Sequence, residues 1–114
     1  MEIFDTEKLR RELHELPDWK RVAFMASCCE RMLPNYQSFS SETGYGDETR
    51  LADALSVIWD WVEEERLPEG LAGLVIACEE QAPDTSEFSS PYTSAALDAA
   101  NSIAVTLEAL SEAT

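Results

Sequence analysis

The stretch WKRVAFMASCCERML, from Trp19 to Leu33, predicts a helix that is apolar around most of its circumference. Its main stripe follows the spacing of one helix face and contains Trp19, Val22, Ala23, Ala26, Cys29 and Leu33. More apolar side chains flank that stripe, namely Phe24, Met25, Cys28 and Met32. A narrow polar strip contains Lys20, Ser27 and Arg31. Because a helix with so little polar surface is a buried one, we expect it at the centre of the fold.

Residues that favour helix ends mark the limits of this central helix. Asp18 is suited to cap its start, and Pro34 is expected to stop it. The following segment, NYQSFSSET (35–43), predicts a short helix or turn that is closed by Gly44.

A first helix is predicted before Pro17. Asp5 and Thr6 are suited to cap it. The side chains expected to face the core are Leu9, Leu13 and Leu16.

A third long helix is predicted from Glu48 to about Glu65, with Asp47 as its cap. One face carries the inward positions Leu51, Leu55, Ile58 and Val62. Trp59 and Trp61 lie on opposite flanks of that face, about 80° to either side. The two tryptophans therefore cannot both occupy the central core.

Two further helices complete the prediction. Leu67 and Pro68 begin a shorter one, whose inward positions are Leu71, Leu74, Val75 and Cys78. Ser90 and Pro91 open the last one, with an inner face of Ala96, Ala99, Ala100, Ile103, Leu107 and Leu110. Strand signals are missing from the sequence. We therefore predict an all-α fold, a compact bundle of about five longer helices plus one short helix, with residues 1–114 as a single domain.

The formal net charge is −15, from 23 acidic and 8 basic residues, and every Lys and Arg precedes position 67. Such a surface repels phosphate backbones and anionic headgroups, so we expect neither nucleic acid nor a membrane as partner. It favours a basic protein partner, although the same charge also serves solubility alone. The N-terminal segment lacks an export-signal pattern, which predicts a cytoplasmic protein.

The sequence offers few groups for catalysis. The single histidine, His14, lies in a charged segment and predicts no nucleophile–base pair. Cys28, Cys29 and Cys78 lack the spacing of a zinc site and are predicted to be reduced core residues. Gly44–Asp47 has too few glycines and no following lysine for a phosphate loop, so a turn and a helix cap are expected there. We predict no catalytic residues, no cofactor and no metal.

The segment 19–47 combines a Trp at the helix start with the FMA-x-x-CERM run (24–32), Pro34-Asn35-Tyr36, Phe39 and Thr43-Gly44-Tyr45-Gly46-Asp47. In these features it resembles the start of the domain of unknown function 416 family, the YjaG-like bacterial proteins. Trp59 and the stretch from Pro83 onward are similar in placement. The resemblance implies an all-helical fold without an established activity, and a partly buried role for Glu30 and Arg31 as an ion pair or as partners of nearby backbone.

The function predicted from these features is that of a non-enzymatic acidic protein-binding module. Its specific form would be a cytosolic immunity protein that neutralises a basic nuclease-type bacterial toxin by covering the active cleft. Acids around aromatic anchors would form the partner-binding surface, in two groups. The residues are Tyr45, Asp47 and Glu48 in one group, and Asp60, Trp61, Glu63, Glu64 and Glu65 in the other. For Trp61, a place at the rim of the core is an equal alternative.

Two other functions stay open at the level of sequence. The chain could be a self-associating helical protein, such as a homodimer, if an apolar stripe on its surface pairs with a second copy. An enzyme that uses carboxylates alone or a bound metal is the third, although nothing in the sequence converges on such a site.

Overall fold

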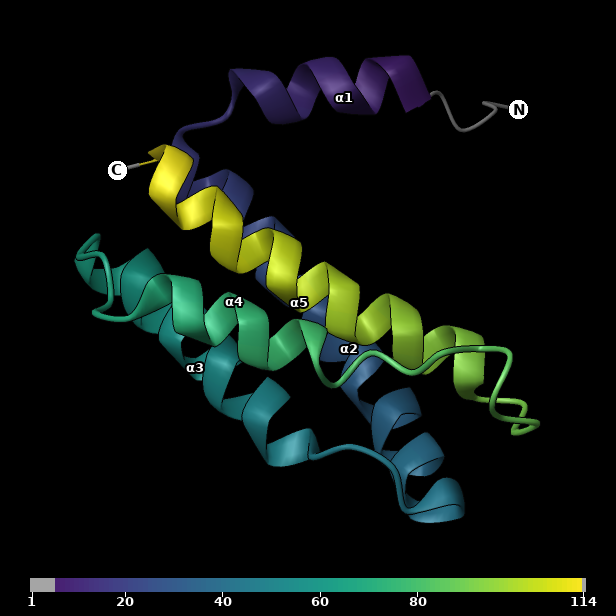
Figure 1. The fold of residues 1–114 in the computed structure, drawn as a ribbon. Helices are drawn as coiled ribbons and strands as arrows, with labels where there is room; N and C mark the ends of the chain where they lie inside the picture. The colour runs from purple at the N-terminus through teal and green to yellow at the C-terminus, as the bar shows by residue number, and fades with distance from the viewer. Residues whose placement is uncertain (1–5, 114) are drawn as a thin grey trace.

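The computed structural model describes residues 6–113 as five α-helices joined by turns and loops. They are α1 (Thr6–Glu15), α2 (Asp18–Thr43), α3 (Glu48–Glu64), α4 (Leu71–Glu79) and α5 (Thr93–Ala113). Figure 1 shows α2 to α5 packed side by side, with α1 set apart from them. The predicted all-α fold is confirmed.

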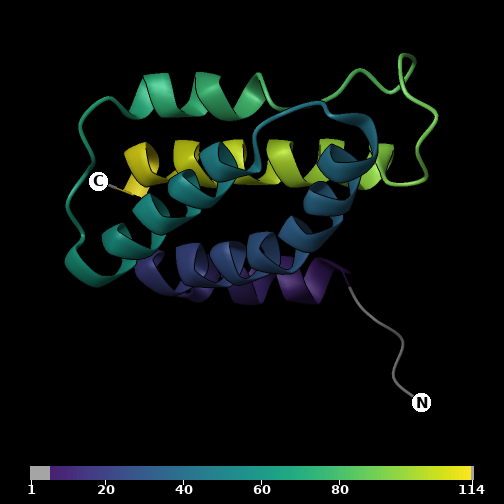
Figure 2. The same ribbon diagram turned by 90° about the horizontal axis from the view of Figure 1, so that it is seen from below.

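Helix α2 does not stop at Pro34, which corrects the prediction of a separate short helix at 35–43. It runs through the proline to Thr43, and Figure 2 shows that it bends on the way, as an internal proline requires. A proline within a helix costs about 3 kcal/mol. The added turns bury Tyr36 and Phe39 completely, and burial of two aromatic side chains offsets that cost. Gly44, in the left-handed conformation at φ 74°, then ends the helix as predicted.

The start of α2 also differs from the prediction. Asp18 is the first residue of the helix instead of its cap, and the residue before the helix is Pro17. The Asp18 carboxylate oxygen Oδ1 accepts a hydrogen bond of 2.9 Å from Arg21, one turn further on. Proline fixes an extended entry to the helix without offering a side-chain acceptor, so the carboxylate is left to pair with the guanidinium.

Helix α1 contributes less to the core than its leucines predict. Leu9, Leu13 and Leu16 are only half-buried, and no residue of this helix is fully buried. Thr6 is the first described residue of the helix, and the proposed cap Asp5 lies outside the described residues. The leucines are only half-buried because α1 stands off the bundle in Figure 1, so that only part of its apolar stripe is covered.

The core lies where α2 and α5 pack against α3 and α4. The inner face of α5 was predicted correctly: Ala96, Ala99, Ala100, Ile103, Leu107 and Leu110 are all 0% exposed. Alanines allow α2 and α5 to approach closely, and Cys29 Sγ lies 3.5 Å from Thr106 Oγ1 between them. At the other end of the pair, Ser90 donates a hydrogen bond to Glu42. The two helices are therefore antiparallel neighbours.

Candidate functional site

The turn between α2 and α3 is held by the buried Tyr36. Its hydroxyl donates a hydrogen bond of 2.7 Å to the carbonyl of Gln81, across the molecule. Gly46 adopts φ 81°, and a Cβ atom there would collide with the same hydroxyl. Glycine is therefore required at position 46 by both conformation and space.

Asp47 and Gln81 tie the same turn to the end of α4. The backbone N–H of Asp47 donates to Gln81 Oε1 at 2.7 Å, while Gln81 Nε2 donates to the carbonyl of Ala77. The Asp47 carboxylate caps α3 as predicted, by accepting a hydrogen bond of 2.9 Å from the Thr49 N–H. Sequence reasoning missed Gln81, because a polar residue just beyond a short apolar helix resembles any loop residue.

Tyr45 and Glu48 are both half-buried beside this turn. The Tyr45 ring packs edge-on against Phe39 and Phe88, with centroids 6.1 and 5.1 Å away, and its hydroxyl donates to the carbonyl of Glu80. Within the chain, Tyr45 and Asp47 therefore already have structural partners. The features that make 44–47 unusual in sequence serve the turn between two helices.

The other predicted group of binding residues surrounds the end of α3. Asp60, Glu63, Glu64 and Glu65 are all exposed. Trp61 is not: it is 3% exposed and belongs to the core, which corrects its prediction as an exposed aromatic anchor. The flank of α3 that carries Trp61 is the one that the neighbouring helices cover. Within α3, about 18 Å of helix separates Glu48 from Asp60, the nearest members of the two groups, so the two groups do not form one surface.

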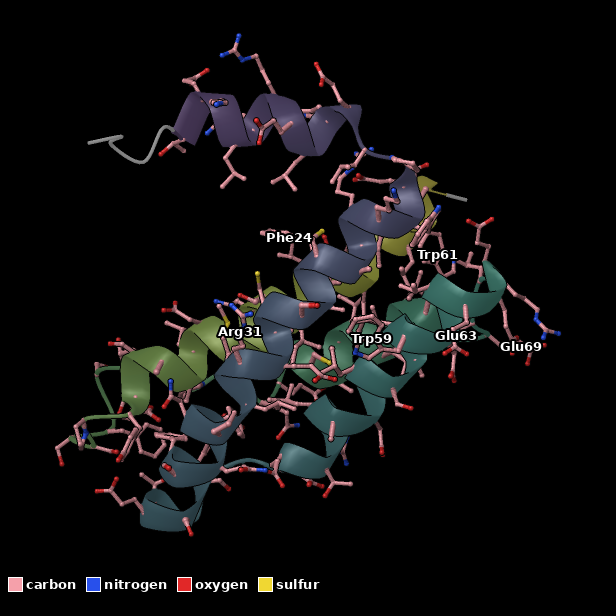
Figure 3. The ribbon with its side chains drawn as sticks, turned by 180° about the vertical axis from the view of Figure 1, so that it is seen from behind. Phe24, Arg31, Trp59, Trp61, Glu63 and Glu69 are labelled. Atoms are coloured by element: carbon pink, nitrogen blue, oxygen red, sulfur yellow. The ribbon has the colours of Figure 1, made fainter. Side chains whose placement is uncertain are left out.

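Trp59, on the opposite flank, is only partly buried. Its indole Nε1 donates a hydrogen bond of 2.9 Å to Glu30 Oε1. Both Glu30 and Arg31 are exposed, so the expected partly buried pair between them is wrong. Figure 3 shows Arg31 on the opposite side of α2 from Trp59, which explains why the neighbouring carboxylate and guanidinium have separate surroundings.

The acidic end of α3 has an unfavourable local structure. Carboxylates near a helix C-terminus oppose the helix dipole. Glu65 adopts the left-handed conformation at φ 53°, the only non-glycine residue with positive φ in the described residues. Arg66 pairs with Glu64 at 2.7 Å, and both side chains are exposed. Figure 3 shows Glu63 and Glu69 at this same end of the molecule.

All three cysteines were predicted to lie in the core, and two of them do. Cys29 and Cys78 are buried in the core, whereas Cys28 is half-buried. Burial raises the pKa of Cys78 to about 11 and raises the pKa of Cys29 as well, against the smaller opposing effect of its contact with Thr106. Both therefore stay as neutral thiols near pH 7, and a neutral buried thiol is a poor nucleophile.

The described range, residues 6–113, contains neither a cluster of metal-binding side chains nor a helix able to span a membrane. No group of three or more His, Cys, Asp or Glu side chains in this range is arranged to hold a metal ion. No helix in the same range combines the length and apolarity needed to cross a bilayer. His14 is exposed on α1.

The class defined so far is an acidic, all-helical protein with an exposed carboxylate cluster at one helix end. Comparison with known sequences specifies it further: the chain belongs to the family described as protein of unknown function (DUF416), which matches residues 8–114. The family resemblance seen in the sequence is thereby confirmed.

Relatives with similar sequences come from several bacteria. The uncharacterized protein YjaG of Escherichia coli (strain K12) is 34% identical over 67% of this chain and 39% of its own length. An uncharacterized protein of Haemophilus influenzae is 27% identical over 90% of this chain and 53% of its own length. The crystal structure of a DUF416 family protein from Shewanella baltica OS155 has 28% identity and a TM-score of 0.84, over 90% of this chain and 52% of that one. This chain thus spans about half the length of these relatives, or less.

Proposed function

We propose that this chain is a non-enzymatic acidic module that binds a basic protein through the end of α3 and the loop that follows. The residues of this surface, called the acidic end below, are Asp60, Glu63, Glu64, Glu65 and Glu69. All five are exposed, and Arg66 is the single base among them in sequence. The surface retains the carboxylates predicted from sequence and loses Trp61, which is buried.

One observation carries the proposal: the chain keeps acids at a place where they oppose its own stability. Each carboxylate near the helix C-terminus costs a few tenths of a kcal/mol to about 1 kcal/mol. Glu65 adds the cost of a left-handed non-glycine residue. Glu64 gains an exposed ion pair with Arg66, which contributes little at the surface, and the exposed side chains gain no packing in return. Local rules are broken without structural compensation mainly at functional sites, which supports a binding role.

Within this class, the proposed specific form is an immunity protein that covers the cleft of a basic nuclease-type toxin. A nuclease needs a positive cleft to bind phosphate, and an acidic inhibitor associates with it rapidly through electrostatic steering. The net charge of −15 supports this form. The localisation that fits it is cytoplasmic.

The proposed surface is tested by affinity capture from bacterial lysates over a series of salt concentrations, with mass spectrometry of the bound proteins. The test variant carries Glu63→Lys, Glu64→Lys and Glu65→Lys. The matched control carries Asp53→Lys, Glu79→Lys and Glu87→Lys, which changes the charge equally at exposed positions elsewhere. We expect the wild type and the control to retain one basic protein that salt releases, and the test variant to lose it.

Two outcomes separate the module from its specific form. Equal binding by the test and control variants would remove the acidic end as the binding surface. If the captured protein is bound but has no nuclease activity that an equimolar amount of this chain abolishes, then the immunity role fails while the binding module stands.

A further inference from the structure

A second surface lies on the paired helices α2 and α5, away from the acidic end. Between them is an apolar groove of about 300 Å³. Its lining includes Phe24, Met25, Cys28 and Met32 of α2 and Ser102 and Val105 of α5. Phe24 is 45% exposed and Val105 is 55% exposed. Figure 3 shows Phe24 on the same side of α2 as Arg31, opposite to Trp59.

The two edges of this groove carry opposite charges. On the outer side of α2 before Pro34, the exposed charged residues are the bases Lys20 and Arg31, which with Ser27 form the polar strip seen in the sequence. Helix α5 contains no Lys or Arg, and its exposed charged residues are Asp98, Glu108 and Glu112. One face of the molecule thus combines an apolar centre, a basic edge and an acidic edge.

We propose that this face binds a second copy of the chain, with a two-fold axis parallel to α2 and α5. Such an axis places the basic edge of one copy opposite the acidic edge of the other, twice per dimer. The apolar groove of each copy then covers that of its partner. A two-fold axis perpendicular to the helices would set basic edge against basic edge, so the charges select the first arrangement.

The height of Lys20 along the helices agrees with this arrangement. Because α2 and α5 are antiparallel, the start of α2 lies beside the end of α5, and Asp18 and Arg21 line the same recess as Glu108 and Glu112. A two-fold rotation about an axis parallel to the helices leaves each residue at the same height along that axis. Lys20 of one copy therefore comes level with Glu112 of the second copy.

The arrangement is tested by sedimentation equilibrium on two charge-reversed variants at an ionic strength of about 0.15 M. The first carries Lys20→Glu and Arg31→Glu, and the second carries Glu108→Lys and Glu112→Lys. In a dimer of either variant alone, like charges would face each other at both symmetry-related edge contacts. We therefore expect monomers where the wild type dimerises. An equimolar mixture restores opposite charges at both contacts, so we expect dimers again.

Substitution of the apolar centre provides a second test with a matched control. Val105→Ser removes an exposed aliphatic side chain from the groove, and we expect at least a tenfold weaker dimer. Ile76→Ser removes a similar side chain, 56% exposed, from α4 outside this face, and we expect no change. Because both side chains are exposed, neither variant should unfold, which circular dichroism checks.

Three results would overturn the proposal. They are a wild-type chain that stays monomeric at every soluble concentration, a mixture of the two charge variants that does not associate, and equal effects of Val105→Ser and Ile76→Ser. The acidic end is unchanged in all of these variants, so they leave the binding of a basic protein untouched.

Discussion

The two connections that flank α3 are built in opposite ways. The connection before it, Gly44–Asp47, has its helix end, its cap and its backbone hydrogen bonds satisfied by specific partners. The connection after it begins at Glu65, a left-handed non-glycine residue, and continues to Gly70, around which there is open space. The first connection is determined by packing. The second has little packing, since every residue from 65 to 70 except the half-buried Pro68 is exposed, and its acids are therefore available for a partner.

The largest expected effect is a difference in stability between alanine substitutions at two glycines that share the same backbone conformation. Gly46 and Gly70 have φ of 81° and 71°, yet only Gly46 lies against the Tyr36 hydroxyl. We expect Gly46→Ala to lower the free energy of unfolding by about 3 kcal/mol or more, because strain and overlap add. Gly70→Ala should cost only about 1 kcal/mol, from its conformation alone. Urea denaturation measures both, and equal losses would show that Tyr36 does not determine the need for glycine.

The next effect concerns the hydroxyl itself. Tyr36→Phe leaves the buried carbonyl of Gln81 without its partner, and we expect a loss of about 1–3 kcal/mol. Because the phenyl ring lacks the atom that meets position 46, Gly46→Ala should cost less in this background. A double-mutant cycle measures that coupling. Strict additivity would contradict the contact.

The same tyrosine gives a dependence on pH. Burial, with a smaller effect of Tyr45 and Asp47, raises the pKa of Tyr36 from 10.0 to about 12. The folded state therefore favours the neutral phenol, and this contribution is complete below pH 10 and lost as the pH rises through 12. Wild type should lose more stability than Tyr36→Phe over that interval, since both share the buried cysteines. Parallel curves in denaturant titrations would exclude this contribution.

A smaller effect is expected at the cap of α3. Asp47→Ala removes the acceptor for the Thr49 N–H and should cost about 1 kcal/mol. Asp47→Asn keeps an acceptor and should cost little, although both variants lose the exposed contact with Arg50. Thermal melts distinguish the two. If both substitutions cost the same, the charge matters more than the hydrogen bond.

The smallest effect has the opposite sign. Glu65→Gly relieves a left-handed non-glycine residue, and we expect a gain of about 0.5–1 kcal/mol after the added chain entropy of glycine is subtracted. Gly44→Ala at the matching end of α2 should instead lose stability. Urea denaturation again provides the measurement. Loss of stability in Glu65→Gly would mean that Glu65 supports the fold, which would weaken the argument for a binding role.

Sequence patterns predicted the elements well where one face of a helix dominates. The inner face of α5 and the cap and length of α3 followed from spacing and cap chemistry alone. The prediction for α2 was wrong because a local rule for proline gave no weight to Tyr36 and Phe39 beyond it. Four residues of the acidic end, Asp60, Glu63, Glu64 and Glu65, were predicted from charge and placement and proved to be exposed, whereas Glu69 was not predicted. The apolar groove was not located, since a helix that is apolar on most sides does not show which side its neighbours leave open.

The sequence by itself determined the helical class, the family, the buried face of α5, most of the buried face of α3, and an excess of acids. These depend on periodicity, residue type and sum of charge, which are local or additive properties of the chain. Only the tertiary structure decided that Trp61 is buried while Trp59 reaches Glu30, that Gly46 meets Tyr36, and that one face has a basic and an acidic edge. Each of these depends on which residues, distant in sequence, lie side by side, and packing alone determines that.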